Sequence, residues 1–274
     1  MGSQAYTSSF ASIYDDIMKR VPYYYWYKYL KHLLVYYEKD PKNILELACG
    51  TGNMLKYFVD KSDLLYGVDS SEDMLAITKN KLSSYEHLKL YNTNMQDIFN
   101  YGDFDFIYSV FDSVNYIHSY EKLLDVFKNA YLNLKQDGIF IFDINTIYRL
   151  SEIKEGTRKV NGDDYTCFWK DIVKSESREW IVELEIYFEN KEEDNNFSER
   201  HVEKGYQLRD IEAGLFEVGF KHVDFYKSFT FKKGRAKNNR VHFVALKNEY
   251  VNRYLKRELI KLKWNLLRLF ISNI

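Results

Sequence analysis

The residues of this chain whose types and spacing could do chemistry lie within 43–53 and at Asp69. A short apolar segment ends at Leu47, and Gly50 and Gly52 follow it. Glycine lets a backbone approach a ligand closely, and the start of a helix offers free N–H groups. Asp69 ends the next apolar run, where a carboxylate can bind the diol of a ribose. The stretch therefore predicts a ligand that contains a ribose.

The spacing of the glycines distinguishes between two nucleotide-binding patterns. In the dinucleotide fingerprint G-x-G-x-x-G the third glycine would stand at Leu55, so that pattern is absent. The stretch instead resembles the first motif of class I S-adenosylmethionine-dependent methyltransferases, acidic-x-G-x-G-x-G, with Glu46 as the acidic residue and Ala48 at the first glycine. The resemblance implies a doubly wound, Rossmann-like α/β fold with a seven-stranded sheet whose last strand is antiparallel. It also implies S-adenosylmethionine as the cofactor.

Composition narrows the class of protein. The chain has 274 residues, of which 46% are hydrophobic, enough for one large domain or one domain with an insertion. Its net charge of −1 gives no general attraction to nucleic acid. Cys49 and Cys167 cannot form a disulfide framework and belong to no metal-ligand cluster, so no metal is expected. No secretion signal or apolar run of membrane length is present, which favours a cytoplasmic protein.

The residues after the glycines supply the rest of the expected cofactor site. Helical spacing over 54–58 predicts that the glycines open a helix, and a second helix is expected over 72–82 with Ser71 as its N-cap. Met74 resembles the family residue that packs on adenine, and packing of the helix on the sheet explains it equally well. After a strand over 87–91, Asn94 stands where the family has an aspartate beside the adenine. In full, the resemblance implies cofactor contacts from Tyr14, Trp26, Ala48, Cys49, Gly50, Gly52, Asn53, Asp69, Ser70, Met74, Asn94, Met95, Gln96 and Val110.

Residues 1–41 are expected to form a helical cap of two helices separated near Pro22. Within it, Tyr14-Asp15 and Val21-Pro22-Tyr23 with Trp26 resemble the motifs Y-D-x-x-M and V-P-Y-x-x-W of one group of small bacterial methyltransferases. The cap of that group closes over the methionine end of the cofactor, where an aromatic ring can hold the sulfonium by cation–π attraction. Packing of the helices on the sheet is the alternative explanation for these aromatic side chains.

A polar loop follows the central strand, which is predicted over 103–110. In open α/β sheets the ligand crevice lies outside the carboxyl ends of the strands. The loop sequence D-S-V-N-Y-I resembles the D-S-[LV]-N-Y motif of the same bacterial group, which implies that Asp112 and Asn115 face the acceptor or the methyl group. A capped loop is the alternative. The N/D-P-P-Y motif of many amine-methylating branches is absent, which counts against methylation of DNA or of protein glutamine.

Residues 151–206 are expected to form an antiparallel lid. The apolar residues alternate at period two over three segments, 165–173, 179–189 and 197–206. Glu199-x-His201 resembles an E-x-H at the end of this lid in the same group and in antibiotic-sugar N-methyltransferases. The resemblance makes His201 the candidate general base, because its usual pKa suits proton transfer at neutral pH. A structural role for a lone histidine is the alternative, and Trp169 is a lesser candidate for the lid wall.

The remaining residues complete the core and add a terminal helix. Residues 207–248 are expected to join 42–150 in one methyltransferase core, through a helix and an antiparallel pair of strands. Residues 249–274 lie outside the resemblance and predict a basic amphipathic helix. Such a helix can dock on its own domain, on a partner chain or on an anionic membrane surface, and the first two are favoured. Its leucines recur every three or four residues, at Leu255, Leu259, Leu262, Leu266 and Leu269.

Together these features predict an enzyme that transfers a methyl group from S-adenosylmethionine to nitrogen or oxygen of a small molecule. Methyl transfer relies mainly on positioning, so little acid–base chemistry is required of the protein. Two alternatives stay open. One is an RNA or protein methyltransferase that docks through its basic tail and the basic loop over 232–237. The other is a non-catalytic cofactor-binding subunit that joins a complex through its terminal helix.

Overall fold

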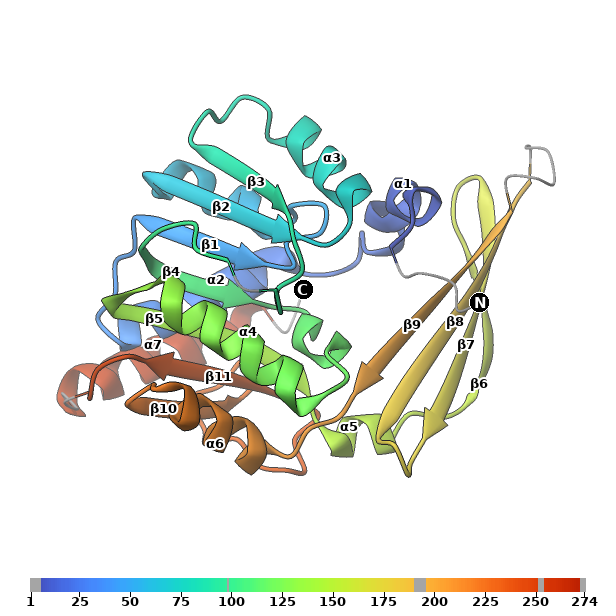
Figure 1. The fold of residues 1–274 in the computed structure, drawn as a ribbon. Coiled ribbons are helices and arrows are strands. Elements are labelled where there is room, and N and C mark those ends of the chain that lie inside the picture. Colours follow the sequence, from blue (N-terminus) through green and yellow to red (C-terminus); the bar gives the residue numbers. More distant parts are fainter. Residues whose placement is uncertain (1–5, 98, 190–195, 251–253, 272–274) are drawn as a thin grey trace.

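The computed structural model describes residues 6–97, 99–189, 196–250 and 254–271 (Figure 1). Its main sheet contains β1 (Asn43–Leu47), β2 (Leu64–Asp69), β3 (Leu88–Asn92), β4 (Phe104–Ser109), β5 (Leu134–Asn145), β10 (His222–Lys227) and β11 (Arg240–Leu246). Their order in space is β10-β11-β5-β4-β1-β2-β3. Neighbouring strands are parallel except β11, which is antiparallel to both β5 and β10. The predicted doubly wound sheet with an antiparallel last strand is confirmed.

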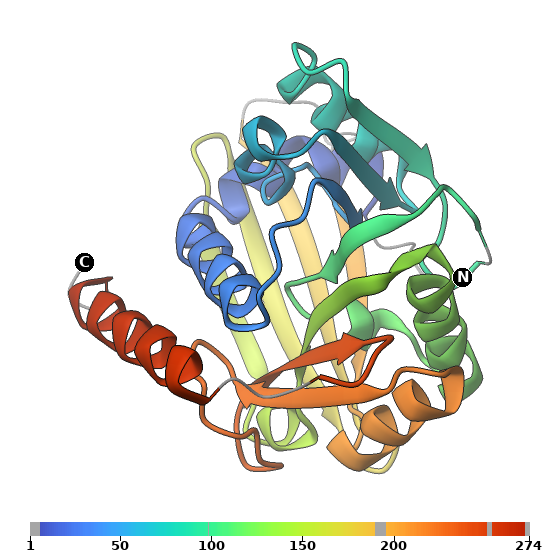
Figure 2. The ribbon, with the colours of Figure 1, turned by 90° about the vertical axis from the view of Figure 1, so that its left-hand side faces the viewer.

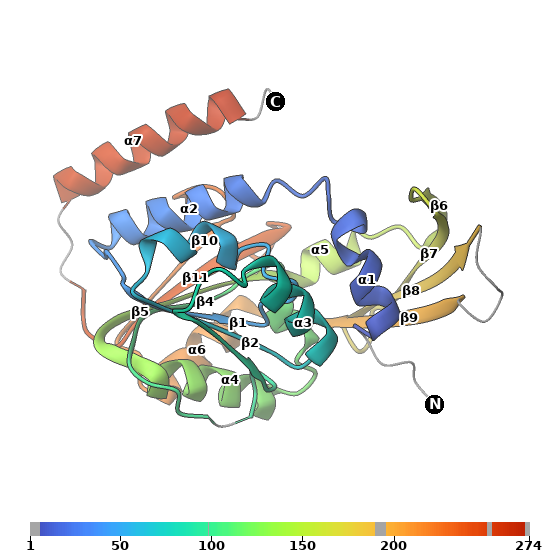
Figure 3. The same cartoon turned by 90° about the horizontal axis from the view of Figure 1, so that it is seen from above.

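Helices cover both faces of the sheet (Figure 3). One face carries α2 (Tyr23–Tyr36) and α3 (Glu72–Lys81), and the other carries α4 (Tyr120–Asn133) and α6 (Leu208–Val218). Successive side chains of β4 point to opposite faces, so that Phe106 packs in the α2 layer and Ile107 in the α4 layer. Both are fully buried, which explains why the central strand is apolar along its length.

Three details of the chain differ from prediction. The glycine turn opens no α-helix, and two short 3₁₀ turns follow it, η1 (Leu55–Tyr57) and η2 (Val59–Lys61). The sequence Tyr57-Phe58-Val59 combines aromatic and β-branched residues, which lose side-chain freedom in an α-helix. The structure also adds α5 (Ile147–Ser151) and β6 (Gly156–Asn161). All but one residue of β6 is exposed, so no apolar alternation marked it in the sequence.

The lid is a second sheet, of four antiparallel strands in the order β6-β7-β8-β9. The three predicted segments form β7 (Tyr165–Lys174), β8 (Glu179–Phe188) and β9 (Phe197–Lys204). Its apolar inner face, which includes Leu184 and Ile186, packs against Phe10 and Ile13 of α1 (Ser8–Ile17). The lid and the N-terminal helix therefore meet beside the carboxyl ends of the strands of the main sheet (Figure 1).

The helix α7 (Tyr254–Ile271) lies along α2 on the outside of the molecule (Figure 2, Figure 3). Trp264 is fully buried, its ring stacks on Tyr25 at 5.4 Å, and its indole N–H donates to the Phe229 carbonyl at 2.9 Å. Arg257 lies against the rings of Tyr36 and Tyr250, 4.1 Å and 4.3 Å from their centres. Within the described residues, no helix is long and apolar enough to cross a membrane.

Candidate functional site

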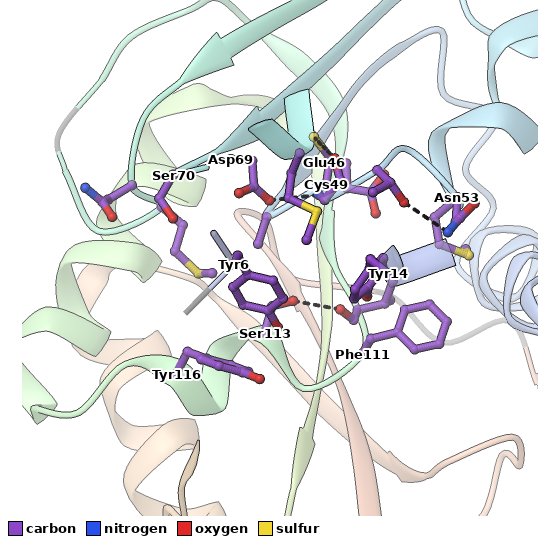
Figure 4. A pocket seen from close by; sticks show the side chains of 18 of the residues that line it. Tyr6, Tyr14, Glu46, Cys49, Asn53, Asp69, Ser70, Phe111, Ser113 and Tyr116 are labelled. Atoms are coloured by element: carbon purple, nitrogen blue, oxygen red, sulfur yellow. Dashed lines mark hydrogen bonds between the residues drawn. The ribbon is translucent and has the colours of Figure 1, made fainter. Parts of the chain in front are cut away.

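A cavity of about 410 Å³ lies at the carboxyl ends of β1, β2 and β4, and Tyr14 of α1 lines it (Figure 4). Its size is within the range of pockets that bind small ligands. The sequence-predicted residues that line it are Tyr14, Ala48, Cys49, Gly50, Asn53, Asp69, Ser70, Met74, Asn94, Met95, Gln96 and Val110. The predicted residues outside its wall are Trp26, Gly52, Asp112, Asn115 and His201. The strand ends thus gather most of the expected cofactor residues, and none of the expected catalytic ones.

The loop after β1 brings backbone to the cavity. Ala48, Gly50 and Gly52 all have positive φ, at 56°, 52° and 75°. A Cβ on Gly50 would meet nothing within 4 Å, so the space beside this residue is open to a ligand. A Cβ on Gly52 would lie 2.8 Å from Cγ2 of Thr78 in α3, so this glycine is required for helix packing. The two glycines therefore have different tasks.

Asp69 is fixed at the tip of β2 by the backbone around it. Its Oδ2 accepts the Gly50 N–H at 2.8 Å, and its Oδ1 accepts the Ser71 N–H at 2.9 Å. Burial raises the pKa of this carboxyl, and the backbone N–H groups work against that rise. Each carboxylate oxygen keeps a free lone pair. Asp69 can therefore accept hydrogen bonds from the two hydroxyls of a diol while its own position stays fixed.

The wall next to Asp69 is apolar and amide-rich. Met74 is buried in α3, and the Ser71 hydroxyl caps that helix by accepting the Met74 N–H at 3.3 Å, as predicted. Met95 is partly buried against the core on the α4 side. Asn94 is exposed and donates through Nδ2 to Asp97 at 3.0 Å, which leaves its carbonyl oxygen available to accept. A planar base fits such a wall of two thioethers and one amide.

The N-terminal cap is tied to the glycine loop by Asp15. Its Oδ1 accepts from Thr51 Oγ1 and Asn53 Nδ2, each at 2.7 Å, and its Oδ2 pairs with Lys81 at 2.6 Å. Burial opposes ionisation of Asp15, but these three partners outweigh it and lower the pKa. The bonds hold α1 above the cavity and leave the neighbouring Tyr14 ring on its wall.

The segment before α1 crosses the cavity. Glu199 of β9 accepts the Tyr6 N–H at 2.8 Å through Oε2, and the Thr7 N–H at 2.9 Å and the Thr7 hydroxyl through Oε1. The Tyr6 carbonyl accepts from the Ser71 hydroxyl at 2.9 Å. Tyr6 has a φ of 62°, and in Figure 4 its ring lies between Asp69 and Tyr116. The lid and the loop beside Asp69 thus hold this segment from two sides.

Comparison with known proteins matches residues 44–138 to a methyltransferase domain family. YqeM of Bacillus subtilis, named as a methyltransferase, is 28% identical over 88% of this chain and 97% of its own. An S-adenosylmethionine-dependent methyltransferase from Clostridium acetobutylicum shares the fold with a TM-score of 0.76 and 29% identity, over 87% of this chain and 98% of that one. This chain is a class I S-adenosylmethionine-dependent methyltransferase.

A more distant structure shares the fold of the methyltransferase. The sugar N-methyltransferase KedS8 from Streptoalloteichus aligns with a TM-score of 0.70 and 16% identity, over 91% of this chain and 95% of that one. The cavity fits the cofactor that the family uses, because the open space at Gly50, the fixed carboxylate of Asp69 and the thioether wall stand in one continuous surface. S-adenosylmethionine supplies the methyl group as an electrophile on a sulfonium.

His201 of this methyltransferase lies behind the cavity wall. Its ring centre is 4.9 Å from that of Tyr6, and its Nδ1 is 3.2 Å from the Tyr116 hydroxyl. Burial lowers its pKa to about 4, and its Nε2 has no hydrogen-bond partner within the described residues. An imidazole with so low a pKa is a weak base at neutral pH, and the role of His201 as general base stays a prediction. In the structure His201 contacts two rings of the wall, those of Tyr6 and Tyr116.

Asp112 and Asn115 also turn away from the cavity. Asp112 accepts from Arg240 Nη2 at 2.8 Å and from Asn145, and Arg240 bridges it to Asp143. Asn115 is fully buried; its Nδ2 donates to the carbonyls of Asn145 and Lys204, and its Oδ1 accepts the Asn145 N–H. Both side chains are committed to joining the loop to β5 and to the lid. Of the two explanations of this motif, the capped loop describes their contacts.

Trp26 supports the wall from a second layer. The centre of its ring is 4.2 Å from that of Phe111, which does line the cavity, and Cζ of Arg240 lies 5.2 Å from the centre of the Trp26 ring. Phe111 and Asp112 are consecutive residues with positive φ, 63° and 55°, an arrangement that is rare for non-glycine residues. The strained turn directs Phe111 inward and Asp112 toward Arg240, and Trp26 packs behind Phe111.

Sequence reasoning missed the residues that form the far end of the cavity, Tyr6, Phe111, Ser113, Tyr116 and Ile117. Ser113 and Tyr116 belong to the quoted D-S-V-N-Y-I motif, and the helical spacing of η3 (Ser113–Tyr116) could have placed these two together. Tyr6 is held at the site by contacts with Glu199, which is 193 positions away in the chain. No local sequence pattern indicates a contact between residues so far apart.

Proposed function

We propose that this enzyme methylates nitrogen or oxygen of a small molecule that carries no phosphate or other strong anion. The observation that carries this proposal is the lining of the cavity. Within the described residues it contains no Lys, Arg or His, and its ionisable groups are Glu46, Asp69, Cys49 and phenols. A nucleic acid or phosphorylated acceptor would find no cation there to pair with its charge.

We assign the cofactor to the half of the cavity around Asp69. Asp69 binds the ribose hydroxyls, Met74 and Met95 enclose the adenine, and Asn94 accepts from its amino group. Gly50 leaves room for the chain that joins ribose to methionine. The ring of Tyr14 faces the sulfonium, which a phenol attracts by cation–π interaction.

The acceptor then occupies the half formed by Tyr6, Phe111, Ser113 and Tyr116. Burial raises the pKa of Tyr6 and Tyr116 well above the usual value, so both are neutral phenols that can donate or accept one hydrogen bond. S-adenosylmethionine would supply the methyl group from its sulfonium, and these side chains would hold the acceptor with its lone pair in line with that group. The proton of the acceptor is released to water after transfer. The protein accelerates this step by holding both reactants in line.

Amines and hydroxyls of sugar size suit this half of the cavity. The fold neighbour KedS8 is named as a sugar N-methyltransferase, which makes amino sugars a reasonable first choice of acceptor. Neutral amines have a free lone pair and need no deprotonation before attack. Hydroxyl acceptors would need a base, and no imidazole or ionised amine touches the cavity among the described residues. We therefore rank amines above alcohols.

The test is a screen with S-adenosylmethionine labelled in the methyl group against amines, amino sugars and hydroxy acids. Transfer to one class, abolished together with cofactor binding in Asp69→Ala, is the expected result. Two results would contradict the proposal. Label transferred to RNA or protein, with salt-dependent RNA binding, would identify a macromolecular acceptor. Calorimetric binding of the cofactor without turnover, in a stable complex with another chain, would identify a non-catalytic subunit.

A further inference from the structure

The helix α7 has two different faces. One face packs on its own domain through Arg257, Ile260 and Trp264, which are all at least nine-tenths buried. The opposite face of the helix carries the leucines that recur in the sequence. Leu259, Leu262 and Leu266 are 61%, 56% and 51% exposed. A contiguous apolar stripe on a charged helix is seldom left in water, and it marks a surface that another molecule covers.

The leucine stripe follows the seven-residue repeat of a coiled coil. If Leu259 and Leu266 occupy position a, Leu262 occupies position d, and in the sequence Leu255 and Leu269 continue the d positions. Every a and d position in this stretch is therefore leucine. Trp264 and Arg257 occupy position f, opposite the seam. Since position f of a two-stranded coiled coil faces away from the partner, docking on α2 leaves the seam free.

The charges beside the seam fit a second copy of the same helix. Glu258 occupies position g and Lys263 position e, five residues later, and both are exposed. In a parallel pair a g residue of one helix meets the e residue five positions on in the other. Two copies side by side would thus form two Glu258–Lys263 ion pairs, one on each side of the leucines. An antiparallel pair would set Lys263 against Lys256 of the other copy.

From the exposed leucine seam and its flanking charges we propose that this methyltransferase forms a homodimer through a parallel pairing of α7. Two heptads are short for an isolated coiled coil, because most of the cost lies in forming the helices. Here α7 is already held as a helix by Trp264 and Arg257, so the pairing orders little new structure. An anionic membrane fits less well, since position g carries Glu258 and Asn265 in place of cations.

The first experiment is sedimentation velocity and light scattering of the full chain across concentration. The expected mass at micromolar concentration is twice the 32.9 kDa of one chain. Leu262→Glu is expected to weaken the dimer at least a hundredfold and give monomer. The matched control is Leu132→Glu, because Leu132 is equally exposed, at 56%, on the helix α4. Calorimetry should give the same cofactor affinity for both variants and the wild type, which separates this test from that of the proposed reaction.

Charge reversal tests the orientation. Glu258→Lys and Lys263→Glu are each expected to weaken the dimer about tenfold, and the two together are expected to restore it, because the pairs form again with opposite sign. The first substitution also removes an exposed pair with Lys261, at 2.7 Å, so circular dichroism should verify that the helix persists. The proposal would be overturned if the wild-type chain were still a monomer at a concentration on the order of 100 μM. It would also be overturned if the double charge reversal did not restore the dimer. Monomers that sediment with phosphatidylglycerol vesicles would identify a membrane surface instead.

Discussion

Substituting Glu199 by Gln should weaken cofactor binding although Glu199 lies outside the cavity. Its two carboxylate oxygens together accept both N–H groups of Tyr6 and Thr7. Tyr6 lines the cavity, and its carbonyl is held from the other side by the Ser71 hydroxyl. The carboxylate is therefore the link by which the lid fixes the segment that crosses the cavity, and glutamine has nearly the same shape with one acceptor oxygen fewer.

The magnitude follows from the hydrogen bonds. In Glu199→Gln one backbone N–H faces an amide NH₂ group and loses its acceptor. A hydrogen bond to a charged group contributes about 1.5–3 kcal/mol, which corresponds to roughly a tenfold to 150-fold change in an equilibrium constant. If the cofactor is bound beneath Tyr6, losing this hydrogen bond shifts the equilibrium from the state in which Tyr6 covers the cavity toward the state in which the cavity is open. We expect the dissociation constant for S-adenosylmethionine to rise about tenfold or more, mainly through faster dissociation.

Calorimetry gives the affinity, and stopped-flow displacement of bound cofactor gives the dissociation rate. The matched control is Glu183→Gln, which removes one charge from an exposed ion pair with Lys170 on the neighbouring strand β8. Tyr6→Ala should reproduce the defect, and the double variant of Glu199 and Tyr6 should be no worse than either single one, because both act through the same contact. Additive effects, or wild-type affinity in Glu199→Gln, would refute the reasoning.

Three further predictions concern the residues around the cavity. Gly52→Ala should lower the free energy of unfolding by about 1–2 kcal/mol through its positive φ alone, and further through contact with Thr78, whereas Gly50→Ala should chiefly weaken cofactor binding; thermal unfolding and calorimetry distinguish the two. Asn115→Ala should destabilise the fold by about 1–3 kcal/mol in urea titration and leave KM for the acceptor unchanged, since its partners become unsatisfied; a selective rise in KM would contradict this. The folded pKa of His201 is about 4, below its unfolded value, so its contribution to stability is complete above pH 6.5 and is lost as the pH falls toward 4. His201→Gln should remove this loss, which is on the order of 3 kcal/mol of unfolding free energy, from that part of the pH–stability curve. An unchanged slope in the variant would show that the ring can take up a proton in the folded protein.

The cofactor half of the cavity could be predicted because its signals are local. Gly50 is open to the ligand within a loop of a few residues, and Asp69 ends a strand whose pairing with β1 follows from the αβ alternation. Ser71 caps α3 through a contact three residues away, which is visible as a sequence pattern. In each case the residues that cooperate are close together in the chain, or are brought together by the most regular part of the fold.

The polar loop after β4 could not be predicted in the same way. Asp112 and Asn115 have the residue types of catalytic groups, but a buried loop also needs polar side chains to satisfy its own backbone. Which use applies depends on Arg240 and Asn145, which come from β11 and β5. The sequence shows which residue types are present in the loop, but it does not show which residues of other strands they contact. The exposed strand β6 was missed for a related reason, because exposure on both faces removes the periodic pattern.

The two halves of the cavity therefore differ in how they are built. The half around Asp69 belongs to the core and is fixed by contacts within the sheet and its first helices. The other half combines Tyr6 from the N-terminal segment and Tyr116 from the loop after β4, both braced by Glu199 and His201 of the lid. Substitutions in the lid can thus reshape the acceptor end directly, and they affect cofactor binding through Tyr6, which crosses the cavity. For this reason the acceptor of this enzyme should be sought by varying Tyr116, and cofactor chemistry should be tested at Asp69.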